Sequence, residues 1–143
     1  MDEFGDRSLI LYDGVCGLCN RLNAFVLKRD SRDHFRFASL QSSTARSILL
    51  RHGKDPADLD TLYLVLQYAK PNEKLLSRSF AVLEILSQLN PGWACLAKLL
   101  RLVPSPLRDL GYRLIAKVRY KIFGKHHSCL IPKKEWQAKF LEV

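Results

Sequence analysis

The stretch SLILYDGVCGLCN, residues 8–20, joins an apolar run to a pair of closely spaced cysteines. Its first five residues are rich in strand formers, and the Asp-Gly dipeptide after them is typical of a turn. From residue 16 to residue 30 apolar side chains recur at helical spacing, with basic side chains elsewhere on the cylinder. The sequence therefore predicts a buried strand, a short turn, and an amphipathic helix whose first turn contains Cys16 and Cys19.

The segments up to residue 90 extend this unit. Residues 34–40 alternate as a half-buried strand does, and Ser42, Ser43 or Thr44 is expected to cap a helix that continues through His52. Strands over 61–67 and 74–78 are predicted to form a hairpin, followed by a helix capped by Ser79. The element order is a βαβ unit joined to a ββα unit, which is the order of thioredoxin-like α/β domains.

Residues 91–143 are basic and read as a helical extension, with helices over 93–102 and 107–123. The second of these helices carries an apolar stripe that we expect to face the core: Leu107, Leu110, Leu114, Ile115, Val118 and Ile122. The prediction is one domain over 1–143, in which this C-terminal helical extension packs on a thioredoxin-like core at 8–90. The alternative for the basic helices is contact with an acidic partner or a membrane surface.

Composition and charge narrow the class of protein. The 143 residues suit one domain, and 48% hydrophobic residues are enough to bury a core. Lys and Arg number 23 against 14 Asp and Glu, a net charge of +9 that would attract anionic partners; we do not expect nucleic acid to be one of them. The first eight residues hold three acidic side chains and no apolar run, so no signal or transit peptide is predicted. We expect a monomeric, cytoplasmic protein.

Cys16 and Cys19 are the candidate redox centre. A helix N-terminus stabilises a thiolate through its free backbone N–H groups and the helix dipole. We therefore expect Cys16, nearer the helix start, to attack a disulfide, and Cys19, one turn later, to resolve the mixed disulfide. Asp13 has two interpretations, a proton carrier that serves Cys19 through water or a turn residue bonded to its own backbone. No cofactor is expected beyond this dithiol and an external thiol reductant or oxidant.

A zinc site is the alternative for the same two cysteines, because Cys-x-x-Cys pairs also bind metal. Cys129 and either His126 or His127 would complete a tetrahedral ligand set. In that case the protein would be a non-catalytic interaction module. The second ligand group lacks a regular zinc-ribbon spacing, and the first pair lies in a strand-to-helix connection, so the redox interpretation is favoured. Cys95, within an apolar segment, is predicted to be a small core residue.

The sequence YDGVCGLCN at residues 12–20 closely resembles the DCC family, which is named for the pattern Asp-x-x-Cys-x-x-Cys. Asp13, Cys16 and Cys19 match that pattern. The resemblance continues through FRFASLQS at 35–42 and through LYLV, SRSFAVLEIL and VRYKIFG, so it covers nearly the whole chain. It implies a thioredoxin-like fold and a thiol-disulfide oxidoreductase that acts on a protein or small-molecule disulfide or thiol.

The chain departs from ordinary thioredoxins in three respects. Gly-Leu stands between the cysteines instead of Gly-Pro, and no tryptophan precedes the first cysteine. Thioredoxins also place a cis-proline just before the third strand to bind the substrate backbone, and residues 59–61 here are Leu-Asp-Thr. The resemblance therefore implies dithiol chemistry and leaves a narrower substrate, or a binding role, open.

Overall fold

The computed structural model describes residues 7–13, 17–30, 33–55, 62–68, 70–123 and 139–141. Its elements follow in the order β1 (Ser8–Tyr12), α1 (Gly17–Arg29), β2 (Phe35–Ser39), α2 (Ser43–Arg51), β3 (Tyr63–Leu66), β4 (Lys74–Ser77), α3 (Arg78–Ser87), α4 (Pro91–Leu100), α5 (Ser105–Phe123) and β5 (Phe140–Leu141). The first seven are the βαβ and ββα units that the sequence predicts. The short strand β5 was not predicted.

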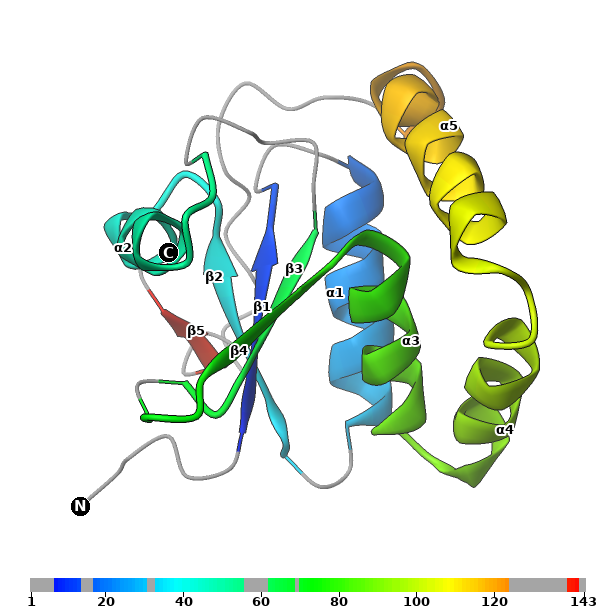
Figure 1. Ribbon diagram of the computed structural model, residues 1–143, viewed down its shortest axis with the longest axis horizontal. Coiled ribbons are helices and arrows are strands. Elements are labelled where there is room, and N and C mark those ends of the chain that lie inside the picture. The colour runs from blue at the N-terminus through cyan, green and yellow to red at the C-terminus, as the bar shows by residue number, and fades with distance from the viewer. Residues whose placement is uncertain are drawn as a thin grey trace.

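The sheet has the strand order β4-β3-β1-β2-β5 (Figure 1). β1 runs parallel to β2 and antiparallel to β3, and β4 runs antiparallel to β3. β5 adds a parallel strand beside β2. The four strands β4-β3-β1-β2 have the order and directions of a thioredoxin-like core, so the predicted α/β fold class is confirmed.

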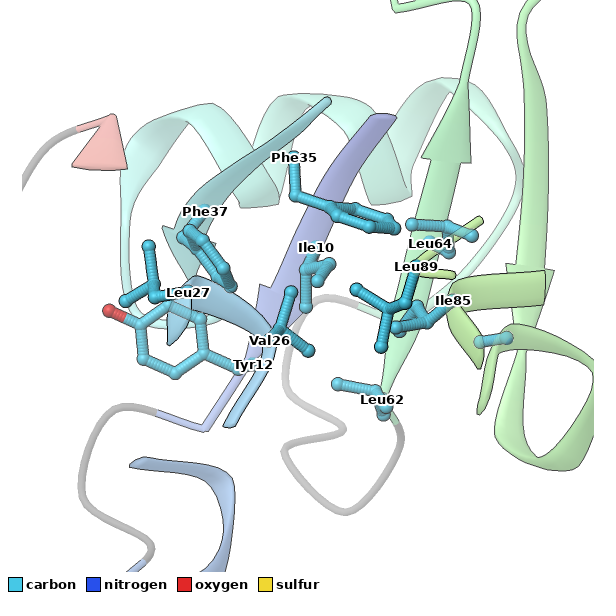
Figure 2. Packing of buried hydrophobic residues seen from close by; sticks show 11 residues of the cluster. Ile10, Tyr12, Val26, Leu27, Phe35, Phe37, Leu62, Leu64, Ile85 and Leu89 are labelled. Carbon is cyan, nitrogen blue, oxygen red and sulfur yellow. The ribbon is translucent and has the colours of Figure 1, made fainter. Parts of the chain in front are cut away.

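Helices cover both faces of the sheet, with α2 on one face and α1 and α3 on the other (Figure 1). Figure 2 shows the larger core cluster, in which side chains from β1, β2 and β3 meet side chains from α1 and α3. Ile10 and Tyr12 of β1 belong to this cluster, while Leu9 and Leu11 belong to the second cluster under α2. Because both faces are covered, β1 is a continuous apolar run rather than an alternating one.

β2 is more deeply buried than its alternating sequence predicts. Phe35 and Phe37 pack in the larger cluster, as expected. Ala38 is fully buried on the opposite face, among the residues packed against α2. The prediction of a half-buried strand is therefore wrong for this part of β2, since α2 covers the face that was expected to meet water.

Two predictions of helix caps have opposite outcomes. Ser42 caps α2, because its Oγ accepts a hydrogen bond from the backbone N–H of Ala45 at 3.2 Å. Ser79 is not a cap, since α3 begins at Arg78 and its N-cap position is Ser77. The hydroxyl of Ser79 instead donates a hydrogen bond to Asp109 Oδ1 of α5 at 2.6 Å. The side chain that was predicted to cap its own helix therefore makes a tertiary contact between α3 and α5.

Asp30 holds the connection between α1 and β2. Its carboxylate is buried, and it accepts one hydrogen bond from the backbone N–H of His34 and another from that of Phe35, both at 2.9 Å. These two bonds fix the chain direction as it leaves the helix and enters the strand. This buried carboxylate therefore ties the end of α1 to the start of β2 through charge-assisted hydrogen bonds.

Asp33 forms an ion-pair cluster that joins three parts of the sheet. Its carboxylate lies 2.8 Å from Arg36 Nη1, 3.0 Å from Lys139 Nζ and 3.6 Å from Arg7 Nη2. The side-chain hydrogen bond from Arg36, followed by that from Lys139, lowers the pKa of Asp33 well below its usual value. The carboxylate therefore stays ionised near neutral pH and links the residues next to β1 and β5 to β2.

The helices α4 and α5 lie outside α1 and α3 (Figure 1). Trp93 of α4 packs edge-to-face on Phe25 of α1, with ring centroids 5.0 Å apart. The prediction that the apolar stripe of α5 faces the core is wrong, because all six of its side chains are between 39% and 67% exposed. No helix among the described residues is long and apolar enough to cross a bilayer.

Candidate functional site

Two of the three predicted site residues, Asp13 and Cys19, lie at one end of the sheet. Asp13 directly follows β1, and α1 begins at Gly17, so the connection leaves the carboxyl end of a strand that runs parallel to β2. Ligand sites of α/β proteins form at this end of parallel strands. Cys16 lies outside the described residues, whereas Asp13 and Cys19 are both described.

Cys19 lies in the first turn of α1, as predicted, although the helix begins at Gly17, and its side chain is half-buried. It packs against the larger core cluster together with Leu22 of the next turn. The backbone N–H groups of the first helical turn have no partners within the helix, so a negative charge near this turn is favoured. The thiol thus lies at the positive end of the α1 dipole.

An apolar pocket of about 220 Å³ lies beside this thiol. Four elements of the core and the extension contribute to its wall: Cys19 and Leu22 of α1, Leu62 next to β3, Val82 of α3, and Tyr112, Ile115 and Ala116 of α5. The thiol of Cys19 and the hydroxyl of Tyr112 are the polar side-chain groups in this lining. The pocket therefore suits an apolar group next to a reacting sulfur, and it exists because α5 packs across α1 and α3.

Tyr112 also binds the backbone next to the pocket. Its hydroxyl accepts a hydrogen bond from the N–H of Leu62 at 2.7 Å. Leu62 immediately precedes β3 and follows residues 59–61, the place where thioredoxins have their substrate-binding cis-proline. The extension therefore contacts the backbone at the start of β3.

The substitution Tyr112→Phe should show how much this hydrogen bond contributes to stability. The substitution keeps the ring but leaves the Leu62 N–H without its acceptor, so we expect the free energy of unfolding to fall by about 1–2 kcal/mol. Amide hydrogen exchange gives the local measurement: the Leu62 amide should exchange faster in Tyr112→Phe. The amide of Leu64, inside β3, is the internal control and should be unchanged. An unaltered exchange rate at Leu62 would show that the hydroxyl does not hold this amide.

Asp13 is almost completely buried, with 1% of its surface exposed. Its Oδ1 accepts a hydrogen bond from Gln41 Nε2 at 2.8 Å. Gln41 is oriented in turn by Ser39 of β2, whose Oγ accepts from the Gln41 backbone N–H at 3.1 Å and donates to Gln41 Oε1. The carboxylate is thus held by a side chain that is 28 residues away in the sequence, at the carboxyl end of the neighbouring parallel strand.

Sequence reasoning assigned no role to Ser39 or Gln41. The signal that could have found them is physical, because a buried carboxylate needs a donor and the next parallel strand ends beside it.

Asn23 of α1 is another buried polar residue to which the sequence assigned no role. It lies one helical turn after Cys19 on the same face, it is 3% exposed, and its amide has no hydrogen-bond partner within the described part of the chain. A polar side chain in a core-facing position of the helix is what distinguishes it in the sequence.

Most ligands of the alternative zinc site lie outside the part of the chain that the structure describes. Cys129, His126 and His127 lie outside the described residues, as Cys16 does. Within the described ranges, no group of three or more His, Cys, Asp or Glu side chains is arranged to hold a metal ion. Cys95 was predicted to be a core residue and is exposed on α4, so that prediction is wrong.

Comparison with known proteins agrees with the motif. Residues 10–125 match the family model of DCC1-like thiol-disulfide oxidoreductases. The chain is 35% identical over 133 residues to the uncharacterized protein YuxK of Bacillus subtilis, and the alignment covers 93% of each chain. It is 37% identical over 127 residues to a protein of Arabidopsis thaliana named as a chloroplastic DCC family protein, covering 89% of this chain and 71% of the relative. No solved structure gives a significant match. The predicted family is confirmed, and the chain belongs to the DCC1-like thiol-disulfide oxidoreductases.

Proposed function

We propose that this protein exchanges thiols and disulfides through Cys16 and Cys19, with Asp13 assisting proton transfer. The observation that carries the proposal is the place of Cys19, in the first turn of α1 and in the wall of an apolar pocket. The family supports the same class of chemistry. The buried Asp13 at the same end of the sheet supplies a carboxylate whose orientation Gln41 fixes.

The proposed reaction has two displacements. The Cys16 thiolate attacks one sulfur of a substrate disulfide, forms a mixed disulfide and releases the other sulfur as a thiolate. Cys19 then loses its proton to Asp13, directly or through water, and attacks the Cys16 sulfur. This forms the Cys16–Cys19 disulfide and releases the second substrate thiolate, so the substrate gains the two electrons that the protein dithiol loses. An external thiol reductant restores the dithiol, and the same steps in reverse oxidise a substrate.

The pocket supports a narrow choice of substrate. Its lining is apolar apart from the Cys19 thiol and the Tyr112 hydroxyl, so a substrate with an apolar group beside its disulfide would gain free energy by filling it. Tyr112 of α5 binds the backbone N–H of Leu62, which follows residues 59–61, and these residues lack the proline with which thioredoxins bind an extended peptide. We therefore propose a protein or small-molecule disulfide that presents such a group, rather than any exposed protein disulfide.

Trapping of mixed disulfides tests the proposed roles. We expect Cys19→Ser to accumulate reducible adducts at Cys16, because the covalent complex has lost its intramolecular exit, and we expect Cys16→Ser to accumulate none. Both variants should also carry Cys95→Ser, since the exposed Cys95 thiol would otherwise form adducts of its own. The measurement is a non-reducing gel of cell lysate that has been quenched with acid.

Two results would contradict the proposal. Equal adducts in Cys16→Ser and Cys19→Ser would reverse or abolish the assigned roles. Stoichiometric zinc in protein purified without chelator, lost in both variants with no adducts formed, would identify the non-catalytic zinc module instead.

A further inference from the structure

Exposed large hydrophobic side chains are concentrated on one part of the described chain. Apart from Leu50 and Phe80, all of them belong to α4, α5 and the connection between these helices: Leu96, Leu99, Leu100, Leu102, Val103, Leu107, Leu110, Leu114, Ile115, Val118 and Ile122. Single exposed apolar residues are normal on a protein surface, but a contiguous group marks an interaction site. We call this group the α4–α5 face.

On α5, the α4–α5 face points away from the domain except at Ile115, which also lines the pocket beside Cys19. Along α5, residues four apart form rows. Tyr112 and Ala116 form the row that meets the core, where both help to line the pocket beside Cys19. Leu114 and Val118 belong to a row on the far side of the cylinder and are 57% and 39% exposed. α5 is also the outermost layer of the fold in Figure 1, so its apolar row is available to a partner.

A row of positive charge borders the apolar row. Arg113, Lys117 and Lys121 are four residues apart, they are exposed, and they adjoin the row of Leu114 and Val118 on the cylinder. Residues 91–123 contain one acidic side chain, Asp109, and it accepts a hydrogen bond from Ser79 of α3. The α4–α5 face therefore combines an apolar strip with a positive margin.

We propose that the α4–α5 face binds the surface of an anionic lipid bilayer. Amphipathic helices with aliphatic side chains on one face and Lys or Arg beside them lie in the plane of the membrane interface. The apolar row would enter the boundary between headgroups and acyl chains, and the row from Arg113 to Lys121 would meet lipid phosphates and carboxylates.

Two other occupants fit the chemistry less well. A second copy of the chain would bring two positive margins together, and like charges across an interface are unfavourable. A protein partner is expected to anchor in Trp, Tyr or Arg side chains, whereas the exposed apolar residues of this face are all Leu, Ile or Val. Aliphatic side chains contribute binding free energy in proportion to the apolar area that they remove from water. A bilayer can bury this area without a specific pocket.

Co-sedimentation of the full chain with lipid vesicles tests the proposal. The vesicles are phosphatidylcholine alone and an equimolar mixture with phosphatidylserine, and we expect binding to the mixture only. Leu110→Ser with Leu114→Ser should lower the partition coefficient by about tenfold or more. Lys117→Glu with Lys121→Glu should lower it by about tenfold as well. All four side chains are exposed, so both double variants should keep the melting temperature of the parent chain.

The matched controls lie on α2, across the sheet. Leu50 is 55% exposed, close to the 57% of Leu114, so Leu50→Ser removes a similar apolar surface from the opposite side of the molecule. Arg46→Glu is the corresponding charge reversal. Neither control should change vesicle binding. The proposal is overturned if the parent chain binds neither kind of vesicle, or if the controls weaken binding as much as the α5 variants do.

Two further outcomes would give the α4–α5 face a different role. Binding that is lost in the Lys variant but kept in the Leu variant would mean attraction by charge alone, without insertion of the apolar row. Self-association in sedimentation velocity that Leu110→Ser with Leu114→Ser abolishes would identify the face as an interface between copies of the chain.

Discussion

The substitution Asp13→Asn should slow the release of a partner from Cys16 by about a hundredfold, while the first attack on that partner keeps its rate. Asparagine has the shape of aspartate and keeps an oxygen that can accept the hydrogen bond from Gln41 Nε2, which is 2.8 Å in the parent protein. It lacks the basic carboxylate that takes a proton. The change therefore removes the proposed proton acceptor for Cys19 with the smallest structural disturbance.

A chromogenic aryl disulfide separates the two steps in a stopped-flow experiment. The first aryl thiolate appears when Cys16 attacks, and the second appears when Cys19 resolves the mixed disulfide. In Asp13→Asn the second phase alone should slow, and it should recover as the pH rises, because Cys19 then ionises without help. Asp55→Asn, in an exposed loop, is the matched control and should leave both phases unchanged. An unaltered second phase in Asp13→Asn would mean that Asp13 has only a structural role.

The second large effect concerns stability, and we expect Asp30→Ala to lower the free energy of unfolding by about 3–5 kcal/mol. Asp30 is buried and accepts from two backbone N–H groups, those of His34 and Phe35. Hydrogen bonds to a charged acceptor contribute about 1.5–3 kcal/mol each, and the substitution leaves two donors without a partner at the entrance to β2. Asp30→Asn should cost less, because one acceptor oxygen remains.

Urea denaturation at neutral pH gives this free energy directly. Lys28→Ala, an exposed change in the last turn of α1 just before Asp30, should stay within about 0.5 kcal/mol of the parent chain. A loss below about 1 kcal/mol in Asp30→Ala would mean that water replaces the carboxylate at both amides. In that case the connection between α1 and β2 would be less rigid than its hydrogen bonds indicate.

The sheet core was predictable because its segments carry local signals. The apolar run of β1 and the alternation of Phe35 and Phe37 identified both strands, and the order of elements along the chain indicated the fold; the pairing of β1 with β2 came only from the structure. β5 carries no such signal, since Phe140 and Leu141 are too few to show a period. Phe140 is instead fixed by stacking on Phe37 with ring centroids 4.9 Å apart, a contact that exists only once the sheet has formed.

The orientation of α5 was not predictable from its periodicity. A helical period groups Leu110, Leu114 and Val118 on one face, but it does not say whether that face meets the core. In the structure Tyr112 and Ala116 meet the core instead, and the larger apolar row is exposed. Prediction of the candidate site had the same limit: the motif identified Asp13 and Cys19, but partners that come from a different strand or turn require the fold.

The pairing of β5 with β2 also bears on how the chain folds. Phe140 pairs with Phe37, 103 residues earlier, so this strand closes a very long loop and is expected to dock late. Until it docks, the outer edge of β2 presents unpaired backbone groups to the solvent. A folding intermediate that has completed the other four strands is therefore a template for pairing between chains, and high protein concentration during refolding should favour aggregation through this edge.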